Sequence, residues 1–330
     1  MILPWKNERI TFERFMEFCL YDPECGYYTT KPKVIGRKGD FYTSPHTHPL
    51  FGQILADAFV SYFDLCSRPK PFHIVEMGAG EGLLREQILT RLRDRYPQIY
   101  KRVEYMPVEV NEALPDGIQG VVFSNELFDA LPVHRVRVRG GEVREIFVYF
   151  GDQISEKEGE ITDSRILNYM ELGFDRWREG YEYEVNLRMV DQLEALEHRI
   201  KSGVVLTIDY GYGWEEYNSE ERASGTLLCY HRHQTGQNPY LNLGDQDITA
   251  HVNFQVMQKT GDRLGWESKP LKRQREFMLE WGLEKALIEE ENRGLLNPDR
   301  IETRLGLKEL LVPGGISDTM KVLVQKVRLS

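Results

Sequence analysis

The glycine-rich segment 78–82, with the sequence Gly-Ala-Gly-Glu-Gly, is the first feature of the chain whose residue types could support chemistry. It follows the apolar run Phe72–Met77 and precedes a segment with helical spacing, which is the strand–turn–helix context of a nucleotide-binding loop. Glycines permit positive φ angles and let a ligand approach the backbone closely. A plain turn that only joins a strand to a helix would use the same residues, so these residues alone allow both interpretations.

Charges around this loop favour a cationic ligand over a dinucleotide. The dinucleotide motif needs a third glycine at position 83, where this chain has Leu83. Glu81 stands where a pyrophosphate would meet the helix N-terminus, and Glu76 adds a second negative charge. S-Adenosylmethionine carries an ammonium and a sulfonium group and no phosphate. We therefore predict S-adenosylmethionine as the ligand, with a nicotinamide dinucleotide as the alternative.

Polar residues follow the next two predicted strands. Glu109 ends the strand predicted over 103–110, where a carboxylate can accept hydrogen bonds from ribose hydroxyls. Asn125, Glu126 and Asp129 follow the strand predicted over 121–124. Ligands of open α/β sheets bind beyond the carboxyl ends of the strands, so all four residues are candidates for one site.

The spacing of Glu126 and Asp129 suggests how an acceptor could be held. Residues three apart share one face of a helical turn. Methyl transfer needs a nucleophile held close to the sulfonium, and arginine is a poor nucleophile because its guanidinium stays protonated. Two carboxylates that grip the guanidinium could orient one nitrogen and localise the charge on the others. A helix N-cap with surface acids has the same spacing and is the alternative.

The elements that must position these residues alternate along the chain. Apolar runs over 72–77, 103–110, 121–124 and 204–210 predict strands buried on both faces of a parallel sheet. Helices are predicted over 10–20, 50–65, 81–95, 164–178, 187–201, 252–264 and 273–291, a hairpin over 133–138 and 143–150, and an antiparallel edge strand over 319–327. The pattern indicates one doubly wound, Rossmann-like α/β domain over 72–330. It has an N-terminal extension over 1–71, an insertion at about 133–200 and a substrate-side loop at about 211–250.

Composition limits the partners and the compartment. The 330 residues are 41% hydrophobic and 28% charged, with a formal net charge of −10 and four cysteines without C-x-x-C spacing. The negative charge argues against nucleic acid and suits a cationic substrate. The apolar runs are too short for membrane insertion, and the first residues do not resemble a signal or transit peptide. We expect a cytoplasmic protein with reduced thiols.

Several motifs occur in one order along nearly the whole chain: Leu20-Tyr21-Asp22-Pro23, Gly26-Tyr27-Tyr28, Gly39-Asp40-Phe41, Thr43-Ser44-Pro45, Phe51-Gly52, the glycine loop, the segment from Asn125 to Val133, Ile208-Asp209-Tyr210-Gly211, Gly225-Thr226-Leu227, Tyr230-His231, and the segment from Asp247 to Phe254. In this order they resemble the MidA family of methyltransferases, which includes the mitochondrial complex I assembly factor. Departures from the family pattern are His46-Thr47-His48 after Pro45 and the short stretch 111–120.

The resemblance implies a class I, seven-stranded methyltransferase core, S-adenosylmethionine as donor and a protein arginine as acceptor. A respiratory-complex subunit is the client that the family suggests, and its mitochondrial members make symmetric dimethylarginine. Carried onto this sequence, the residues that would close over the donor are Gly39, Asp40, Phe41, Thr43 and Ser44. Those that would hold it are Glu76, Gly78, Gly80, Glu109 and Asn125. Asn125, Glu126 and Asp129 would face the acceptor.

The histidines and Tyr210 can be explained without a role in catalysis or metal binding. His46 and His48, with His231 and His233, could be imagined as four metal ligands, but the surrounding spacing does not support a metal and none is predicted. His251 could line the active-site loop or be structural, and Tyr210 could form a wall of the acceptor channel. Alternatives to arginine methylation remain open: methylation of a small molecule or of another side chain, or a non-catalytic assembly chaperone that retains the donor site.

Overall fold

The computed structural model describes residues 4–30, 48–110, 112–232, 234–292 and 319–329, and these form two compact units. The parallel-sheet unit consists of the described parts of 42–127, 194–210 and 261–330. The antiparallel unit consists of the described parts of 1–41, 128–193 and 211–260. The division does not fall at the predicted boundary of 71/72, because the helix over 50–65 packs in the core of the parallel-sheet unit.

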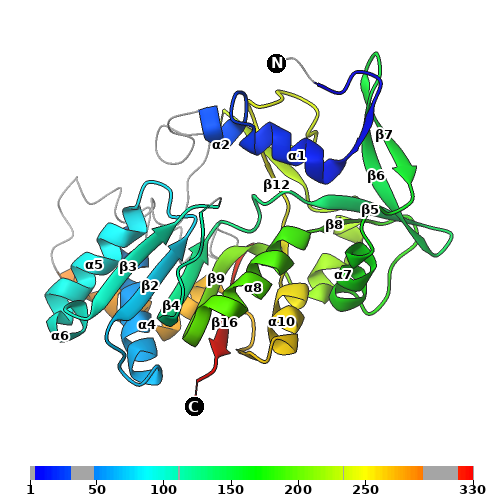
Figure 1. Ribbon diagram of the computed structural model, residues 1–330. Helices are drawn as coiled ribbons and strands as arrows, with labels where there is room; N and C mark the ends of the chain where they lie inside the picture. Colours follow the sequence, from blue (N-terminus) through cyan, green and yellow to red (C-terminus); the bar gives the residue numbers. More distant parts are fainter. Residues whose placement is uncertain (1–3, 31–47, 111, 233, 293–318, 330) are drawn as a thin grey trace. The chain divides into compact units, whose positions relative to one another are not determined.

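The parallel-sheet unit contains the strands predicted from the apolar runs. Strands β2 (Phe72–Met77), β3 (Val103–Val108), β4 (Ile118–Asn125) and β9 (Ile200–Tyr212) are parallel, and β16 (Met320–Val327) is antiparallel to β9. Their order across the sheet is β3-β2-β4-β9-β16, as Figure 1 shows. The prediction of a mixed α/β fold with a parallel sheet is confirmed.

Two details of the predicted sheet are wrong. The strand β16 is not an edge strand, because β14 (Glu267–Ser268) and β15 (Lys272–Arg273) pair with its other side. With β13 (Val252–Asn253), which pairs with the end of β9, the sheet counts eight strands in the part of the chain described, not seven. The extra strands have two residues each, too few to give a periodic signal in the sequence.

One face of this sheet is covered by α4 (Leu50–Leu65), α5 (Leu83–Arg95), α11 (Gln274–Glu280) and α12 (Leu283–Asn292), whose apolar side chains form one core with the strands. The ring of Phe59 lies 5.2 Å from that of Phe123 in this core. The short helix α6 (Pro97–Tyr100) follows α5. The single helix predicted over 273–291 is divided in two at Gly282, whose φ of +104° a helix cannot contain.

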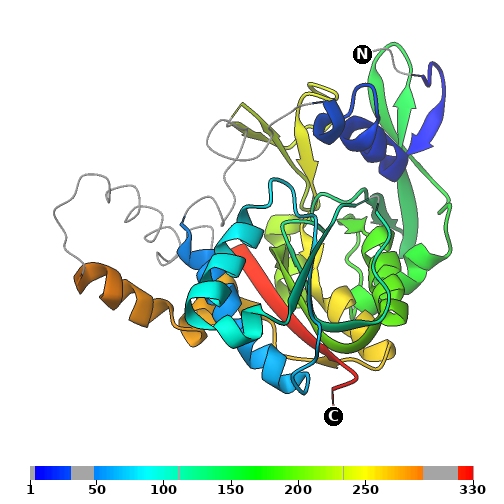
Figure 2. The same cartoon turned by 60° about the vertical axis from the view of Figure 1, so that its left-hand side comes forward.

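The antiparallel unit has two sheets. The larger contains β1 (Arg9–Thr11), β5 (His134–Arg139), β6 (Glu142–Phe150), β7 (Ile154–Gly159) and β8 (Glu182–Val185), and the smaller contains β10 (Leu228–His231), β11 (Gln234–Gly236) and β12 (Asp247–Thr249). The helices are α1 (Phe12–Tyr21), α2 (Tyr27–Thr30), α7 (Arg165–Gly173), α9 (Trp214–Tyr217) and the first parts of α8 (Leu187–Arg199) and α10 (Phe254–Arg263). The helix α1 lies beside β5 and β6 (Figures 1 and 2).

The core of this unit joins segments that are distant in sequence. Phe12 and Phe15 of α1 pack in one cluster with Phe150 of β6 and Cys229 of β10. The substrate-side loop predicted at about 211–250 contains a strand of the core, β10, because Cys229 and the neighbouring Leu227 are buried.

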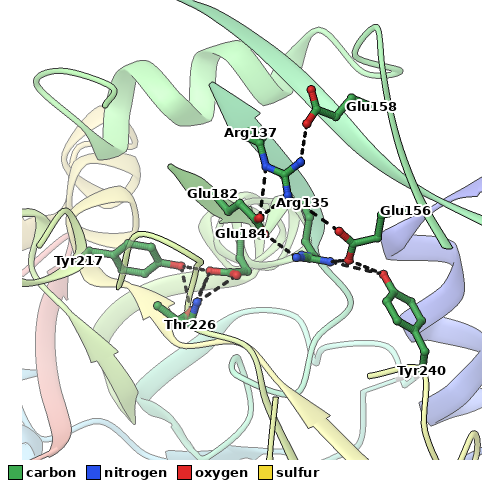
Figure 3. A network of polar contacts seen from close by, with 9 residues as sticks. All are labelled: Arg135, Arg137, Glu156, Glu158, Glu182, Glu184, Tyr217, Thr226 and Tyr240. Atoms are coloured by element: carbon green, nitrogen blue, oxygen red, sulfur yellow. Dashed lines mark hydrogen bonds and ion pairs between the residues drawn. The ribbon is translucent and has the colours of Figure 1, made fainter. Parts of the chain in front are cut away.

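Charged side chains form a ladder on one face of the larger sheet (Figure 3). Arg135 and Arg137 are two residues apart on β5, and their side chains therefore point to the same side of the sheet. Arg135 forms ion pairs with Glu156 and Glu182, and Arg137 forms ion pairs with Glu158 and Glu182. The Tyr240 hydroxyl donates to Glu156 Oε1 at 2.8 Å. Glu156 and Glu182 compensate the charge of the buried Arg135 guanidinium, so the ladder has a structural explanation.

Candidate active site

The glycine loop leaves β2 in a conformation that glycine alone adopts easily. Gly78, Gly80 and Gly82 have φ angles of +70°, +53° and +73°. A Cβ on Gly78 would lie 2.9 Å from Leu127 Cδ1, whereas one on Gly80 would have nothing within 4 Å. The loop is therefore packed against the segment after β4 at its first glycine and is open at its second. The helix α5 begins at Leu83, two residues later than predicted.

The acid predicted for the ribose lies beside this loop. Glu109 directly follows β3, and its Oε1 accepts a hydrogen bond from the Gly80 backbone N–H at 3.0 Å. The Glu109 N–H in turn donates to Glu112 Oε2 at 3.0 Å, which fixes the backbone at this point. The structure thus brings Gly80 and Glu109 together at the carboxyl edge of the sheet.

Glu76 lies beneath the loop, on β2, and is 3% exposed. Burial raises the pKa of the Glu76 carboxyl from 4.5 to about 7, and the Tyr105 hydroxyl, which donates to Oε2 at 2.5 Å, offsets part of that rise. Tyr105 had not been singled out from the sequence. Its position on β3, the strand that pairs with β2, is the only signal that could have indicated it.

This raised pKa predicts a pH dependence of stability. The folded state binds the Glu76 proton more tightly than the unfolded chain does, so the unfolding free energy falls between pH 4.5 and 7 and stays lower above pH 7. The loss is on the order of 3 kcal/mol. We expect Glu76→Gln, which cannot ionise, to gain stability relative to wild type by that order on going from pH 4 to pH 8, measured by urea unfolding. Glu104→Gln, an exposed acid on β3, should show no such gain. Parallel pH profiles for wild type and Glu76→Gln would contradict the assignment.

The segment after β4 does not form the predicted helical turn. Residues 126–132 form bends and a turn, and Glu126 has a φ of +54°, rare for a residue other than glycine. The Glu126 N–H donates to the Ile208 carbonyl at 2.9 Å, and the Leu127 N–H donates to Asp209 Oδ2 at 3.1 Å. These bonds to the end of β9 hold the chain in that conformation.

Asn125 and Glu126 are in direct contact. Asn125 Nδ2 donates to Glu126 Oε1 at 3.1 Å, while Asn125 Oδ1 is buried and has no hydrogen-bond partner within the described part of the chain. Asp209 is fully buried and was not predicted to act here. Asp129 is buried and belongs to the antiparallel unit, where its carbonyl accepts a hydrogen bond from the Ala250 N–H at 2.9 Å.

Other predicted residues lie elsewhere or outside the described residues. Those outside are Gly39, Asp40, Phe41, Thr43, Ser44, His46 and His233. His48 Nδ1 accepts a hydrogen bond from the Leu50 N–H, and His231 pairs with Asp245. The His251 ring packs edge-on against Tyr212, and burial, with the charge of Arg222, lowers its pKa to about 4. Tyr210 packs at the border of the parallel-sheet core.

Neither a metal centre nor a membrane-spanning helix is found in the part of the chain that the structure describes. No group of three or more His, Cys, Asp or Glu side chains there is arranged to hold a metal ion. No helix there is long and apolar enough to cross a membrane.

A parallel sheet with a glycine turn after β2 and an acid after β3 is the arrangement of a nucleotide-cofactor enzyme, and comparison with known proteins identifies the class. A family model described as "Putative S-adenosyl-L-methionine-dependent methyltransferase" matches residues 54–119 and 113–271, which is more than half of the chain. The chain belongs to this family, and S-adenosylmethionine is its methyl donor.

Individual relatives agree with this class. The protein arginine methyltransferase NDUFAF7 homolog of Drosophila melanogaster, a mitochondrial protein, is 24% identical over 78% of this chain and 67% of its own. The human protein arginine methyltransferase NDUFAF7, also mitochondrial, is 25% identical over 92% of this chain and 80% of its own. A crystal structure from Burkholderia thailandensis, bound to S-adenosyl-homocysteine, superposes with a TM-score of 0.81 at 26% identity and covers 98% of this chain and 89% of that one.

The described residues fit the donor. Asn125 Oδ1 is a buried acceptor without a partner in the described residues, and it lies at the carboxyl end of β4, suited to an ammonium or amine N–H. Gly80 leaves open space for a ligand against its backbone, and Glu109 stands after β3, where a carboxylate could accept hydrogen bonds from ribose hydroxyls. When bound, S-adenosylmethionine supplies an electrophilic methyl group on a sulfonium. Asn125, Gly80 and Glu109 would hold it.

Proposed function

We propose that this methyltransferase modifies an arginine side chain of a protein client. The observation that carries the proposal is Glu126: a carboxylate at the carboxyl end of β4, next to the donor loop, held at a φ of +54° by hydrogen bonds to β9. Backbone strain of this kind persists where the surrounding structure enforces it, and it clusters at functional sites. The names of the curated relatives, protein arginine methyltransferases at about 25% identity, support the same acceptor.

Methyl transfer to arginine explains why the site would need carboxylates. One guanidinium nitrogen would form a bond to the methyl carbon as the C–S bond of the donor breaks, with the electron pair of that bond left on sulfur. The proton that the modified nitrogen loses would pass to the Glu126 carboxylate and from there to water. Glu126 would bind the guanidinium through its N–H groups, orient one nitrogen and keep the positive charge on the others. Asp129 is the second carboxylate that the family resemblance assigns to the acceptor. The formal charge of −10 suits a basic client surface.

Peptide methylation tests the acceptor. Peptides that differ only in one central residue, arginine or lysine, are incubated with the enzyme and methyl-labelled S-adenosylmethionine, and the products are located by mass spectrometry. We expect label on the arginine nitrogens and at least about 100-fold less on lysine. The reason is that the lysine ammonium cannot donate two parallel hydrogen bonds to a carboxylate, as the planar guanidinium does. Tandem spectra distinguish mono- from symmetric dimethylarginine.

The outcomes separate the alternatives. Transfer to lysine or to a small molecule instead would replace the arginine proposal while keeping the methyltransferase class. Donor binding without transfer to any acceptor in a cell extract would favour an assembly chaperone. A cytoplasmic location stays a prediction from the sequence, and the curated relatives carry mitochondrial names.

A further inference from the structure

The turn that carries Asp129 is fixed by three separate segments of the antiparallel unit. The carbonyls of Phe128, Asp129 and Ala130 each accept one hydrogen bond: from Asn186 Nδ2 at 2.9 Å, from the Ala250 N–H at 2.9 Å, and from the Tyr21 hydroxyl at 3.0 Å. The donors come from the start of α8, from the chain after β12 and from the end of α1. Three successive carbonyls are thus tied down by segments that are remote in sequence.

Of these donors, the Tyr21 hydroxyl is the one that comes from the N-terminal segment. Its ring stacks on that of Tyr28, with centroids 5.5 Å apart and an interplanar angle of 25°. The Tyr28 hydroxyl donates to Asp247 Oδ1 at 2.9 Å, and Asp247 is a fully buried residue of β12. The orientation of Tyr21 is therefore set by a second tyrosine, which is itself anchored to a buried carboxylate.

The Asp129 carboxylate lies within electrostatic reach of both rings. Burial first, then the charges of Asp247 and Asp129, raise the pKa of the Tyr21 hydroxyl well above its ordinary value. The pKa of the Tyr28 hydroxyl is raised well above its ordinary value by burial first and then by Asp247, Tyr21 and Asp129. Both hydroxyls therefore stay protonated and remain hydrogen-bond donors. Arg188 reduces the effect at Tyr21 and is itself paired with Glu13 at 2.5 Å and Glu17 at 2.8 Å.

We propose that Tyr21 is a positioning residue for the acceptor: its hydroxyl fixes the Phe128–Ala130 turn so that Asp129 presents its carboxylate to the guanidinium in one orientation. The inference rests on the proposed function, because it assumes that Asp129 binds the acceptor. A displacement of about 1 Å of a positioning group is enough to reduce a rate by about 100-fold, so a fixed turn has a catalytic consequence.

The test compares two Tyr→Phe variants. Tyr21→Phe removes only the hydroxyl that reaches Ala130. Tyr183→Phe is the matched control: its buried hydroxyl, in the same unit, donates to Asn218 Oδ1 at 2.8 Å and accepts from the Arg178 N–H, and neither partner belongs to the turn. Hydrogen exchange of the peptide covering 127–133, followed by mass spectrometry, reports on the turn directly. We expect exchange about tenfold faster in Tyr21→Phe, the factor of one lost hydrogen bond, and wild-type exchange in Tyr183→Phe.

Steady-state kinetics test whether Tyr21 acts on the acceptor through Asp129. We expect Tyr21→Phe to raise the KM for an arginine peptide about five- to tenfold, with donor affinity within about twofold of wild type. In an Asp129→Asn background the same substitution should have no further effect, because it acts through that carboxylate. Additive effects, or unchanged exchange in the turn, would overturn the proposal. If wild type methylates no arginine peptide, the proposed function fails, and the exchange comparison still decides whether Tyr21 fixes the turn.

Discussion

Gly78→Val should remove donor binding from a protein that remains folded. Gly78 adopts a φ of +70°, which valine rarely adopts, and a Cβ there would lie 2.9 Å from Leu127 Cδ1, so the loop must change its backbone conformation and the Leu127 side chain must move aside. A changed loop conformation would disrupt the donor site. We expect the affinity for S-adenosylmethionine, measured by calorimetric titration, to fall at least about 100-fold, which corresponds to about 2.7 kcal/mol.

Gly117→Val is the matched control for this substitution. Gly117 lies in the same unit with a φ of +69°, and a Cβ there would meet nothing within 4 Å. Both variants carry a left-handed backbone strain of about 1–2 kcal/mol, which should lower the Tm of each, but only Gly78→Val should lose the donor. Normal donor binding by Gly78→Val would show that this loop is not the donor site. Loss of binding in both variants would indicate general destabilisation.

The donor half of the site could be predicted from sequence because its signals are local. Phe72–Met77 is a continuous apolar run, the glycine turn follows it directly, and Glu109 follows the next strand. Local periodicity and turn chemistry are what single-sequence interpretation detects best. The parallel arrangement followed because buried strands that alternate with helices have few other solutions.

The acceptor half depends on contacts between residues far apart in the chain, and for that reason less of it could be predicted from the sequence. Asp209 holds the Leu127 N–H across 82 residues, and Tyr21 reaches Ala130 across 109. Neither contact has a local pattern. The spacing of Glu126 and Asp129 indicated a helical turn, but hydrogen bonds from this segment to β9 and Asp209 override that local preference. The ladder of Arg135 and Arg137 was also missed, because its partners come from separate strands.

Glu126→Gln should abolish methyl transfer while leaving donor binding intact. The amide has nearly the shape of the carboxylate and can still accept from Asn125 Nδ2, but it carries no negative charge to hold a guanidinium. We expect kcat for an arginine peptide to fall about 100- to 1000-fold, the usual effect of removing one well-placed electrostatic partner. Donor affinity by calorimetry should stay within about twofold. Glu104→Gln removes an exposed acid from the same unit and should retain full activity. Full turnover by Glu126→Gln would remove Glu126 from the mechanism.

A second variant at this position separates a catalytic role from a structural one. Glu126→Gly relieves the strain of the φ of +54° but adds chain entropy to the unfolded state, so we expect it to be more stable than wild type by about 0.5 kcal/mol in urea unfolding. Its activity should be as low as that of Glu126→Gln. A variant that gains stability and loses turnover would show that this chain keeps a strained carboxylate for chemistry, since folding alone would favour glycine here. A less stable glycine variant would instead mean that the Glu126 side chain supports the fold at the end of β4.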